Sequence, residues 1–166
     1  MDDKDKACKE VVPTKYYFAD PAKQAELKRI LDEWIRTPFR HHCGVKGLGC
    51  DCIHFVIRVF EEMGRLKEGQ IKIPDYPHDW HLHNTRELLL ERMLERAGKG
   101  RIVPADLNAP MNGDLILSHY GAAASHAAFY FDGHVYQAVN KIGVCKISFS
   151  DPIFRKQMKY AYRLMA

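Results

Sequence analysis

The feature that most constrains the fold is a change of pattern near Pro110. Before it, apolar residues recur at helical spacing, whereas beyond it the chain breaks into short apolar runs separated by turn residues. Helices that precede a series of short strands predict an α+β domain. A chain of 166 residues has room for one such unit, so we expect a single domain over residues 1–166, with a polar tail over about residues 1–14.

Two helices are marked by clear start signals. Asp20 and Pro21 supply an N-cap and a proline at the first helical position, and the helix that follows ends before Pro38. Asp51 caps a second helix, which begins at Cys52 and carries a buried apolar stripe. Cys52 therefore lies in the first turn of a helix.

A third helix is predicted over residues 84–97, opened by a capping box of Asn84 and Glu87. Strands follow, two of which are joined by the turn-forming pair Asp132 and Gly133. The strands are expected at residues 114–118, 126–131, 134–139, 144–149 and 160–164. The N-terminal helices should pack on an antiparallel sheet of five or six strands.

Three residues in this framework suggest nucleophilic chemistry. Free N–H groups and the positive end of the dipole at a helix start favour the thiolate form of a cysteine such as Cys52. His126, which begins a strand, is a candidate base. A two-residue turn pairs His126 with Val139 and places Gln137 diagonally beside His126 on one face of the sheet. The Gln137 carbonyl oxygen is then expected to accept the Nδ1–H of His126, which leaves Nε2 toward the sulfur.

Each of these residues also has a purely structural interpretation. A cysteine on an apolar helix stripe is usually a small core residue. A strand histidine is often simply buried and hydrogen-bonded. Gln137 as a cross-strand polar residue without a catalytic role is an open alternative.

Four sequence blocks, taken in order, resemble a known family. The blocks are Thr37-Pro38-Phe39-Arg40, Gly49-Cys50-Asp51-Cys52-Ile53-His54-Phe55-Val56, Asn112-Gly113-Asp114-Leu115 and Ser125-His126-Ala127. Together they resemble the NlpC-type papain-like cell-wall cysteine peptidases, from about Ala25 to the C-terminus. The loop with Lys46-Gly47 and the segment Asp79-Trp80-His81-Leu82-His83 look most like the branch found with bacteriophage tail genes.

This resemblance implies a papain-like fold and a hydrolase that cleaves an amide bond in peptidoglycan stem peptides, often between γ-D-glutamate and a diamino acid. It implies that Cys52 is the nucleophile, His126 the general base and then acid, and Gln137 the residue that orients the imidazole. The substrate contacts that it implies are Asp51, Phe39, Ile53 and Ser125. No cofactor is implied.

Departures from the family pattern motivate an alternative function. Members often have Tyr where this chain has Phe39, and Ser-Gly where it has Ile53 and His54. Phe39 and Ile53 lack the hydroxyl groups that members use near the nucleophile. The alternative is a catalytically altered module of the same fold that binds the cell wall or a phage tail.

A crowded group of histidines and cysteines motivates a third hypothesis, a metal- or redox-linked thiol protein. The group comprises His41, His42, Cys43, Cys50 and Cys52, with His78, His81 and His83 further along the chain. Thiolate and imidazole are ligands of zinc. Because no second closely spaced ligand pair accompanies Cys43 and Cys50, we predict no metal site.

Composition and charge limit the binding partners and the cellular location that we expect for this protein. A net charge of +4 is too small to argue for nucleic acid, and no run approaches the roughly 20 apolar residues of a membrane span. The charged N-terminus lacks the apolar run of a secretory signal, so we expect a protein that is cytoplasmic as synthesised, with its cysteines reduced. The resemblance adds an expectation that phage tail components are partners and that a virion carries the protein to the cell wall.

Overall fold

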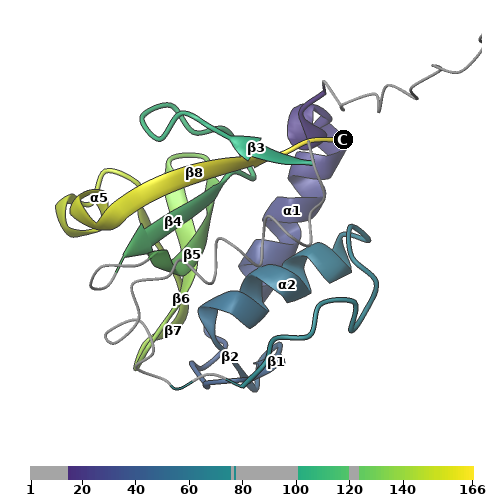
Figure 1. The fold of residues 1–166 in the computed structure, drawn as a ribbon, viewed down its shortest axis with the longest axis vertical. Coiled ribbons are helices and arrows are strands. Elements are labelled where there is room, and N and C mark those ends of the chain that lie inside the picture. The colour runs from purple at the N-terminus through teal and green to yellow at the C-terminus, as the bar shows by residue number, and fades with distance from the viewer. Residues whose placement is uncertain (1–14, 76, 78–100, 120–123) are drawn as a thin grey trace, which may run out of the picture.

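The fold is built on one large antiparallel sheet with helices packed against it (Figure 1). The computed structural model describes residues 15–75, 77, 101–119 and 124–166. The strands of this sheet are β3 (Ile102–Pro104), β4 (Leu115–His119), β5 (Ala124–Phe131), β6 (His134–Val139), β7 (Gly143–Ser148) and β8 (Met158–Leu164). Their order across the sheet is β3-β8-β4-β5-β6-β7, and every neighbouring pair is antiparallel.

The remaining elements are helices and a small hairpin. They are η1 (Tyr17–Ala19), α1 (Pro21–Trp34), β1 (Gly44–Val45), β2 (Gly49–Cys50), α2 (Cys52–Glu62) and α5 (Pro152–Gln157). The predicted α+β class and the antiparallel sheet of five or six strands are confirmed. The predicted helix at residues 84–97 and the polar tail lie outside the described residues, and β3 and α5 are not among the predicted elements.

Both predicted helix starts have the expected caps. The Asp20 carboxylate accepts a hydrogen bond from the N–H of Ala22, and the Asp51 carboxylate accepts one from the N–H of His54. Behind these caps, each helix turns an apolar stripe toward the sheet. The buried residues of α1 are Leu27, Ile30, Leu31 and Trp34, and those of α2 are Ile53, Phe55, Val56, Ile57, Val59 and Phe60. They form one core cluster with residues of β4, β5, β6, β7 and β8.

A buried ion pair fixes the entry to β4. Asp114 is fully buried, and its two carboxylate oxygens accept hydrogen bonds from the Nε and Nη2 atoms of Arg163, at 3.0 and 2.8 Å. The same carboxylate also accepts the N–H of Met111. Asp114 therefore ties β4 to β8, which gives it a structural role.

The loop after α1 is attached to the edge of the sheet through Thr37. The N–H of Val144 donates to the carbonyl oxygen of Thr37 at 2.8 Å. Gly143 has a φ of +92°, and a Cβ atom built on it would lie 2.4 Å from that same oxygen. Glycine is required here because the two backbones approach so closely. The attachment holds the loop that carries Phe39, which forms an isolated bridge with Cys50 just before α2.

The hairpin between β5 and β6 has the predicted turn but a shorter ladder than predicted. Asp132 and Gly133 both have positive φ, at 46° and 75°, as a two-residue turn of this type requires. The ladder ends at the pair Phe129 and Tyr136. The predicted pairing of His126 with Val139 is therefore wrong, because the two strands separate before reaching it.

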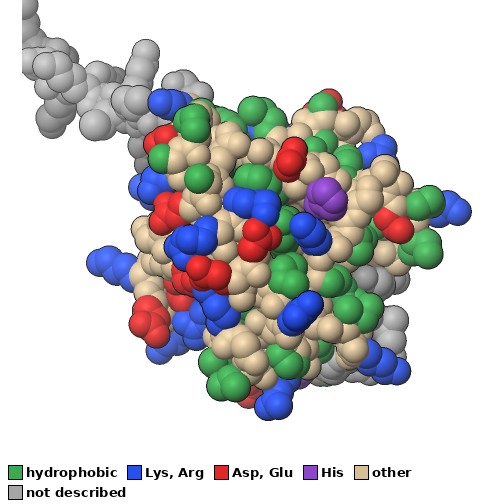
Figure 2. Space-filling model, turned by 180° about the vertical axis from the view of Figure 1, so that it is seen from behind, with side chains coloured by type: hydrophobic (Ala, Val, Ile, Leu, Met, Phe, Trp, Pro, Cys, Tyr) green, Lys and Arg blue, Asp and Glu red, His purple; other side chains and the backbone are tan. Residues whose placement is uncertain are grey.

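Acidic and basic side chains are intermingled on the surface. Figure 2 shows Lys or Arg next to Asp or Glu across much of the face that it displays, rather than a patch of one sign. On α1, Lys28 pairs with Asp32 and Arg29 with Glu33. None of the helices in the described ranges is long and apolar enough to cross a membrane.

Candidate active site

Cys52 is the first residue of α2, and its sulfur contacts β5. The Cys52 Sγ atom lies 3.8 Å from the carbonyl oxygen of Ser125, and the backbone N–H of Ala127 is a hydrogen-bond donor to the sulfur. These two groups lie on either side of His126 in the chain. The structure therefore brings the predicted nucleophile to the segment that carries the predicted base.

The separation of β5 from β6 explains how the sulfur gains this donor. Continuing the observed register would pair Ala127 with Ala138, and the N–H of Ala127 would then point toward β6. Because the ladder stops at Phe129 and Tyr136, that N–H faces the sulfur instead. A backbone donor of this kind has no signature in the sequence, so sequence reasoning could not have found it.

The Cys52 thiol is protonated at rest. Burial, followed by the negative charge of Asp51, raises the pKa of the Cys52 thiol to about 12. The backbone N–H groups of Ala127, Cys52 and Ile53 act in the opposite direction. The stabilisation of the thiolate expected at a helix start is thus present but is outweighed by burial, so this cysteine needs a base to become a nucleophile.

His126 and Gln137 are brought together as predicted, but through the other ring nitrogen. The Nε2 atom of His126 lies 2.8 Å from the Oε1 atom of Gln137, and both residues are buried. The predicted bond from Nδ1 is wrong. The prediction assumed that the β5–β6 ladder continues to His126, and the ladder ends before that point.

This hydrogen bond determines the proton positions on the ring. Because a carbonyl oxygen only accepts, Nε2 of His126 carries the proton and Nδ1 is left with a lone pair. Burial lowers the pKa of His126 from its ordinary value, while the hydrogen bond to Gln137 partly opposes that shift. The imidazole is therefore neutral at rest and available as a base.

Asp51 is held by its own surroundings. Its Oδ1 atom accepts the N–H of His54 at 2.9 Å and lies 2.8 Å from Nδ1 of the same histidine. Its Oδ2 atom accepts the N–H of His42 at 2.8 Å. The residue is 2% exposed. These contacts with His42 and His54 fix the carboxylate at the start of α2, and a substrate contact by Asp51 remains a prediction.

The other predicted substrate contacts lie around the same helix start. Ile53 is buried in the core, and its backbone N–H is a hydrogen-bond donor to the Cys52 sulfur. Ser125 is buried on β5, with its carbonyl oxygen toward that sulfur. Phe39 is partly buried and packs against the core cluster. Their roles toward a substrate also remain predictions.

The histidine and cysteine cluster is packed together without forming a metal site within the described residues. In that part of the chain, no group of three or more His, Cys, Asp or Glu residues is placed to hold a metal ion. The ring of His42 instead contacts those of His41 and His54, with centroids 4.8 and 5.7 Å away. His78, His81 and His83 lie outside the described residues.

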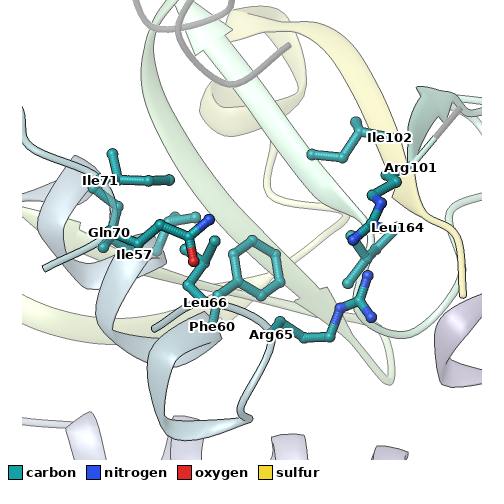
Figure 3. Close-up of a pocket in the computed structure, with 10 residues that line it drawn as sticks. Ile57, Phe60, Arg65, Leu66, Gln70, Ile71, Arg101, Ile102 and Leu164 are labelled. Carbon is teal, nitrogen blue, oxygen red and sulfur yellow. The ribbon is translucent and has the colours of Figure 1, made fainter. Parts of the chain in front are cut away.

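A separate cavity of about 110 Å³ lies further along α2 (Figure 3). Figure 3 shows Phe60 at its centre, with Arg65, Arg101 and Leu164 on one side and Gln70 and Ile71 on the other. Its lining includes none of the predicted site residues.

The fold and this site together define a papain-like α+β domain with a cysteine at the start of α2, a histidine on β5 and a glutamine on β6. The NlpC/P60 family matches residues 36–163, which is most of the chain, and the chain belongs to that family. Its members are generally cysteine hydrolases that act on cell-wall peptides.

Two solved structures have the same fold. An NLP/P60 family protein of Staphylococcus aureus, described as similar to a lipoprotein, has a TM-score of 0.61 and 17% identity, covering 95% of this chain and 45% of that one. An NlpC/P60 family protein of Bacillus cereus has a TM-score of 0.58 and 20% identity, covering 86% of this chain and 40% of that one. The chain thus spans less than half the length of either protein. No curated protein matches it.

Proposed function

We propose that this protein is a cysteine endopeptidase or amidase that hydrolyses an amide bond in peptidoglycan stem peptides. The observation that carries the proposal is the contact of the Cys52 sulfur with the backbone on both sides of His126, whose ring is held by Gln137. A thiol, a neutral imidazole and an orienting amide are the groups that amide hydrolysis through a thioester requires. Membership of the NlpC/P60 family supports the cell-wall substrate.

In the first half of the reaction, the sulfur of Cys52 attacks the amide carbonyl carbon while its proton passes to Nδ1 of His126. The new S–C bond gives a tetrahedral intermediate with a negative oxygen, to which we propose that the N–H of Cys52 donates a hydrogen bond. The C–N bond then breaks, and the imidazolium gives its proton to the departing amine. The products are a free amine and a thioester on Cys52.

In the second half, water attacks the thioester carbon and gives a proton to Nδ1 of His126. The C–O bond forms and the C–S bond breaks. The proton returns from the imidazolium to the sulfur, which leaves the Cys52 thiol and a carboxylic acid product. No cofactor takes part, since acid–base and nucleophilic groups of the chain itself carry every step.

The bond that we propose is cleaved lies between γ-D-glutamate and a diamino acid. The free amine of such a stem peptide would be attracted by the negative charge of Asp51, although this carboxylate already accepts hydrogen bonds from His42 and His54. Phe39, in place of a residue with a hydroxyl group, makes that side of the site more apolar. We therefore expect the rate of cleavage of a stem peptide to depend on which residue lies next to its free amine.

A wall- or tail-binding module without activity is the second candidate. The observation that favours it is the raised pKa of the Cys52 thiol, about 12, which makes the resting cysteine a poor nucleophile. Such a module would retain peptidoglycan sacculi without releasing fragments. The same preparation, assayed for both binding and release, separates the two functions.

Delivery is part of the proposal. The resemblance of the Lys46-Gly47 loop to the tail-associated branch supports a virion that carries the protein to the cell wall, with phage tail components as partners. Detection of the chain in purified virions by mass spectrometry would support this route. Its absence from virions that nevertheless lyse their host would contradict it.

The proposed reaction is tested by mass-spectrometric identification of the products from defined muropeptides. Wild-type protein should release a new amine and a new carboxylic acid from one bond, whereas Cys52→Ala should release neither. Cys145→Ala is a matched control, because Cys145 is a partly buried thiol on β7 whose pKa burial also raises. Intact muropeptide after prolonged incubation with wild type would contradict the proposal.

A further inference from the structure

Ser118 occupies the cross-strand position directly opposite His126. The register of β4 and β5 pairs these two residues. Residues directly opposite each other in an antiparallel pair carry their side chains on the same face, with Cβ atoms about 4.5–5.5 Å apart. Gln137 reaches the same imidazole from β6. His126 therefore lies between a hydroxyl group on one strand and an amide on the other.

The Ser118 hydroxyl is buried and unpartnered. The residue is 0% exposed, and its Oγ atom has no hydrogen-bond partner among the residues that the structure describes. Burying a hydroxyl group without a partner is unfavourable, so an apolar side chain would suit the resting protein better. An unpaired buried hydroxyl next to a candidate active site is explained if it makes its interaction in a state other than the resting one.

We propose that Ser118 is a positioning residue that stabilises the positively charged form of His126 during catalysis. This inference rests on the proposed function, because the imidazole gains its charge only when it takes the proton of Cys52. A hydroxyl group rotates freely and can turn its oxygen toward the ring once a positive charge is there. In the resting protein the ring is neutral, and the hydroxyl has no charge to orient against.

The imidazolium needs such help at this position. Burial disfavours the charged ring and lowers the pKa of His126. The Gln137 oxygen holds Nε2, and Nδ1 is occupied by the transferred proton. The Ser118 hydroxyl is then a second neutral dipole next to the ring. Turning this hydroxyl toward the charge costs little because the site excludes water.

The charged and titratable groups near Ser118 come from the elements that pack around it. The start of α2, which contacts β5, contributes Asp51 and Cys52, and α5, which packs on β4, contributes Arg155 and Lys156. On β8, the neutral Met158 lies opposite Ser118, and Lys159 follows it. His119 follows Ser118 on β4. A shift in the pH profile caused by removing the Ser118 hydroxyl must therefore be separated from the titration of Asp51, Lys159 and His119.

The experiment measures kcat/KM against pH for wild type, Ser118→Ala, Ser118→Thr and Ser118→Val on a muropeptide that wild type cleaves. Without the hydroxyl, the imidazolium is less stable, so the plateau should fall about 10-fold and the acidic limb should move to lower pH. Thr and Val have the same shape and share any packing cost, so Thr should retain more activity than Val. The thermal unfolding temperature of Ser118→Ala should be equal to or higher than that of wild type, because no resting hydrogen bond is lost and an unpartnered buried hydroxyl is removed.

Two results would overturn the role of Ser118. One is a Ser118→Ala profile with the plateau and the acidic limb of wild type. The other is equal impairment of the Thr and Val variants with an unshifted limb, which would indicate packing alone. Wild-type protein that cleaves no muropeptide would instead overturn the proposed function itself, so the two failures are distinguishable.

Discussion

The Nε2 atom of His126 is 2.8 Å from the Oε1 atom of Gln137, and this hydrogen bond joins two strands that have already separated. Because the β5–β6 ladder ends at Phe129 and Tyr136, two side chains make the connection where the backbone ladder no longer does. The bond fixes the tautomer and the plane of the ring. It thereby leaves Nδ1 as the atom that exchanges a proton.

Loss of the Gln137 amide should impair catalysis more than folding. In Gln137→Ala, the ring of His126 loses its acceptor, and we expect kcat/KM to fall about 10- to 100-fold, as for a hydrogen bond to a group that becomes charged. Gln137→Glu keeps an acceptor but adds a negative charge, which should raise the pKa of His126 and move the acidic limb to higher pH. Steady-state kinetics across pH would check both. An unchanged kcat/KM in Gln137→Ala would assign this residue to structure alone.

The acidic limb of activity should lie below pH 6.5. Activity requires a neutral His126 as base, and burial lowers the pKa of this residue from its ordinary value of 6.5. A lowered pKa keeps the base neutral to lower pH, so activity is retained at pH 6.5 and lost only further down. The pH dependence of kcat/KM, measured with a pH-stable preparation, gives this limb directly. A limb above 6.5 would contradict the burial argument.

Neutralising Asp51 should make Cys52 more acidic. Asp51 raises the pKa of the Cys52 thiol, so Asp51→Asn removes a negative charge, lowers that pKa and speeds alkylation by iodoacetamide at fixed pH. Asparagine still caps α2, so the fold should be retained, whereas Asp51→Ala should lose about 1 kcal/mol of stability. Peptide mapping would assign the label to Cys52 rather than to the buried Cys50. Slower alkylation of Cys52 in Asp51→Asn than in wild type would contradict the claim that Asp51 raises the pKa of this thiol.

Breaking the Asp114–Arg163 pair should destabilise the domain. Removing Arg163 leaves the fully buried Asp114 carboxylate unpaired, and Arg163→Ala should reduce the free energy of unfolding by about 3–5 kcal/mol. The control is Glu33→Ala on α1, whose solvent-exposed carboxylate pairs with Arg29 and Lys46, so that its loss should change the free energy of unfolding far less. Urea unfolding of both variants measures the difference. Equal stabilities would show that β4 and β8 do not depend on this ion pair.

Helix starts and the hairpin were predicted correctly where the sequence contains a capping residue or a turn-forming pair. Asp20 with Pro21, Asp51, and the Asp132–Gly133 pair each begin or join the element expected of them. The same Asp-Pro signal stands at Asp151 and opens α5, but that helix is too short to show an apolar period. β3 has only 3 residues and is defined mainly by its pairing with β8.

The site was predictable in its residues but not in its geometry. Chain order and the hairpin turn place Gln137 near His126, because both follow from local spacing. The ring nitrogen that Gln137 binds depends on where the β5–β6 ladder ends, and no turn or cap in the sequence marks that point. The N–H of Ala127 and the raised pKa of Cys52 likewise arise from tertiary burial.

A double-mutant cycle between Cys52 and His126 tests the central claim most directly. The claim is that one thiol and one imidazole act as a single proton-exchanging pair, so Cys52→Ala, His126→Ala and the double variant should lose kcat/KM on the same muropeptide to nearly the same extent, by about 10³-fold or more. Circular dichroism of each variant confirms that the domain is folded. Losses that simply add in the double variant, or full activity in either single variant, would contradict the account.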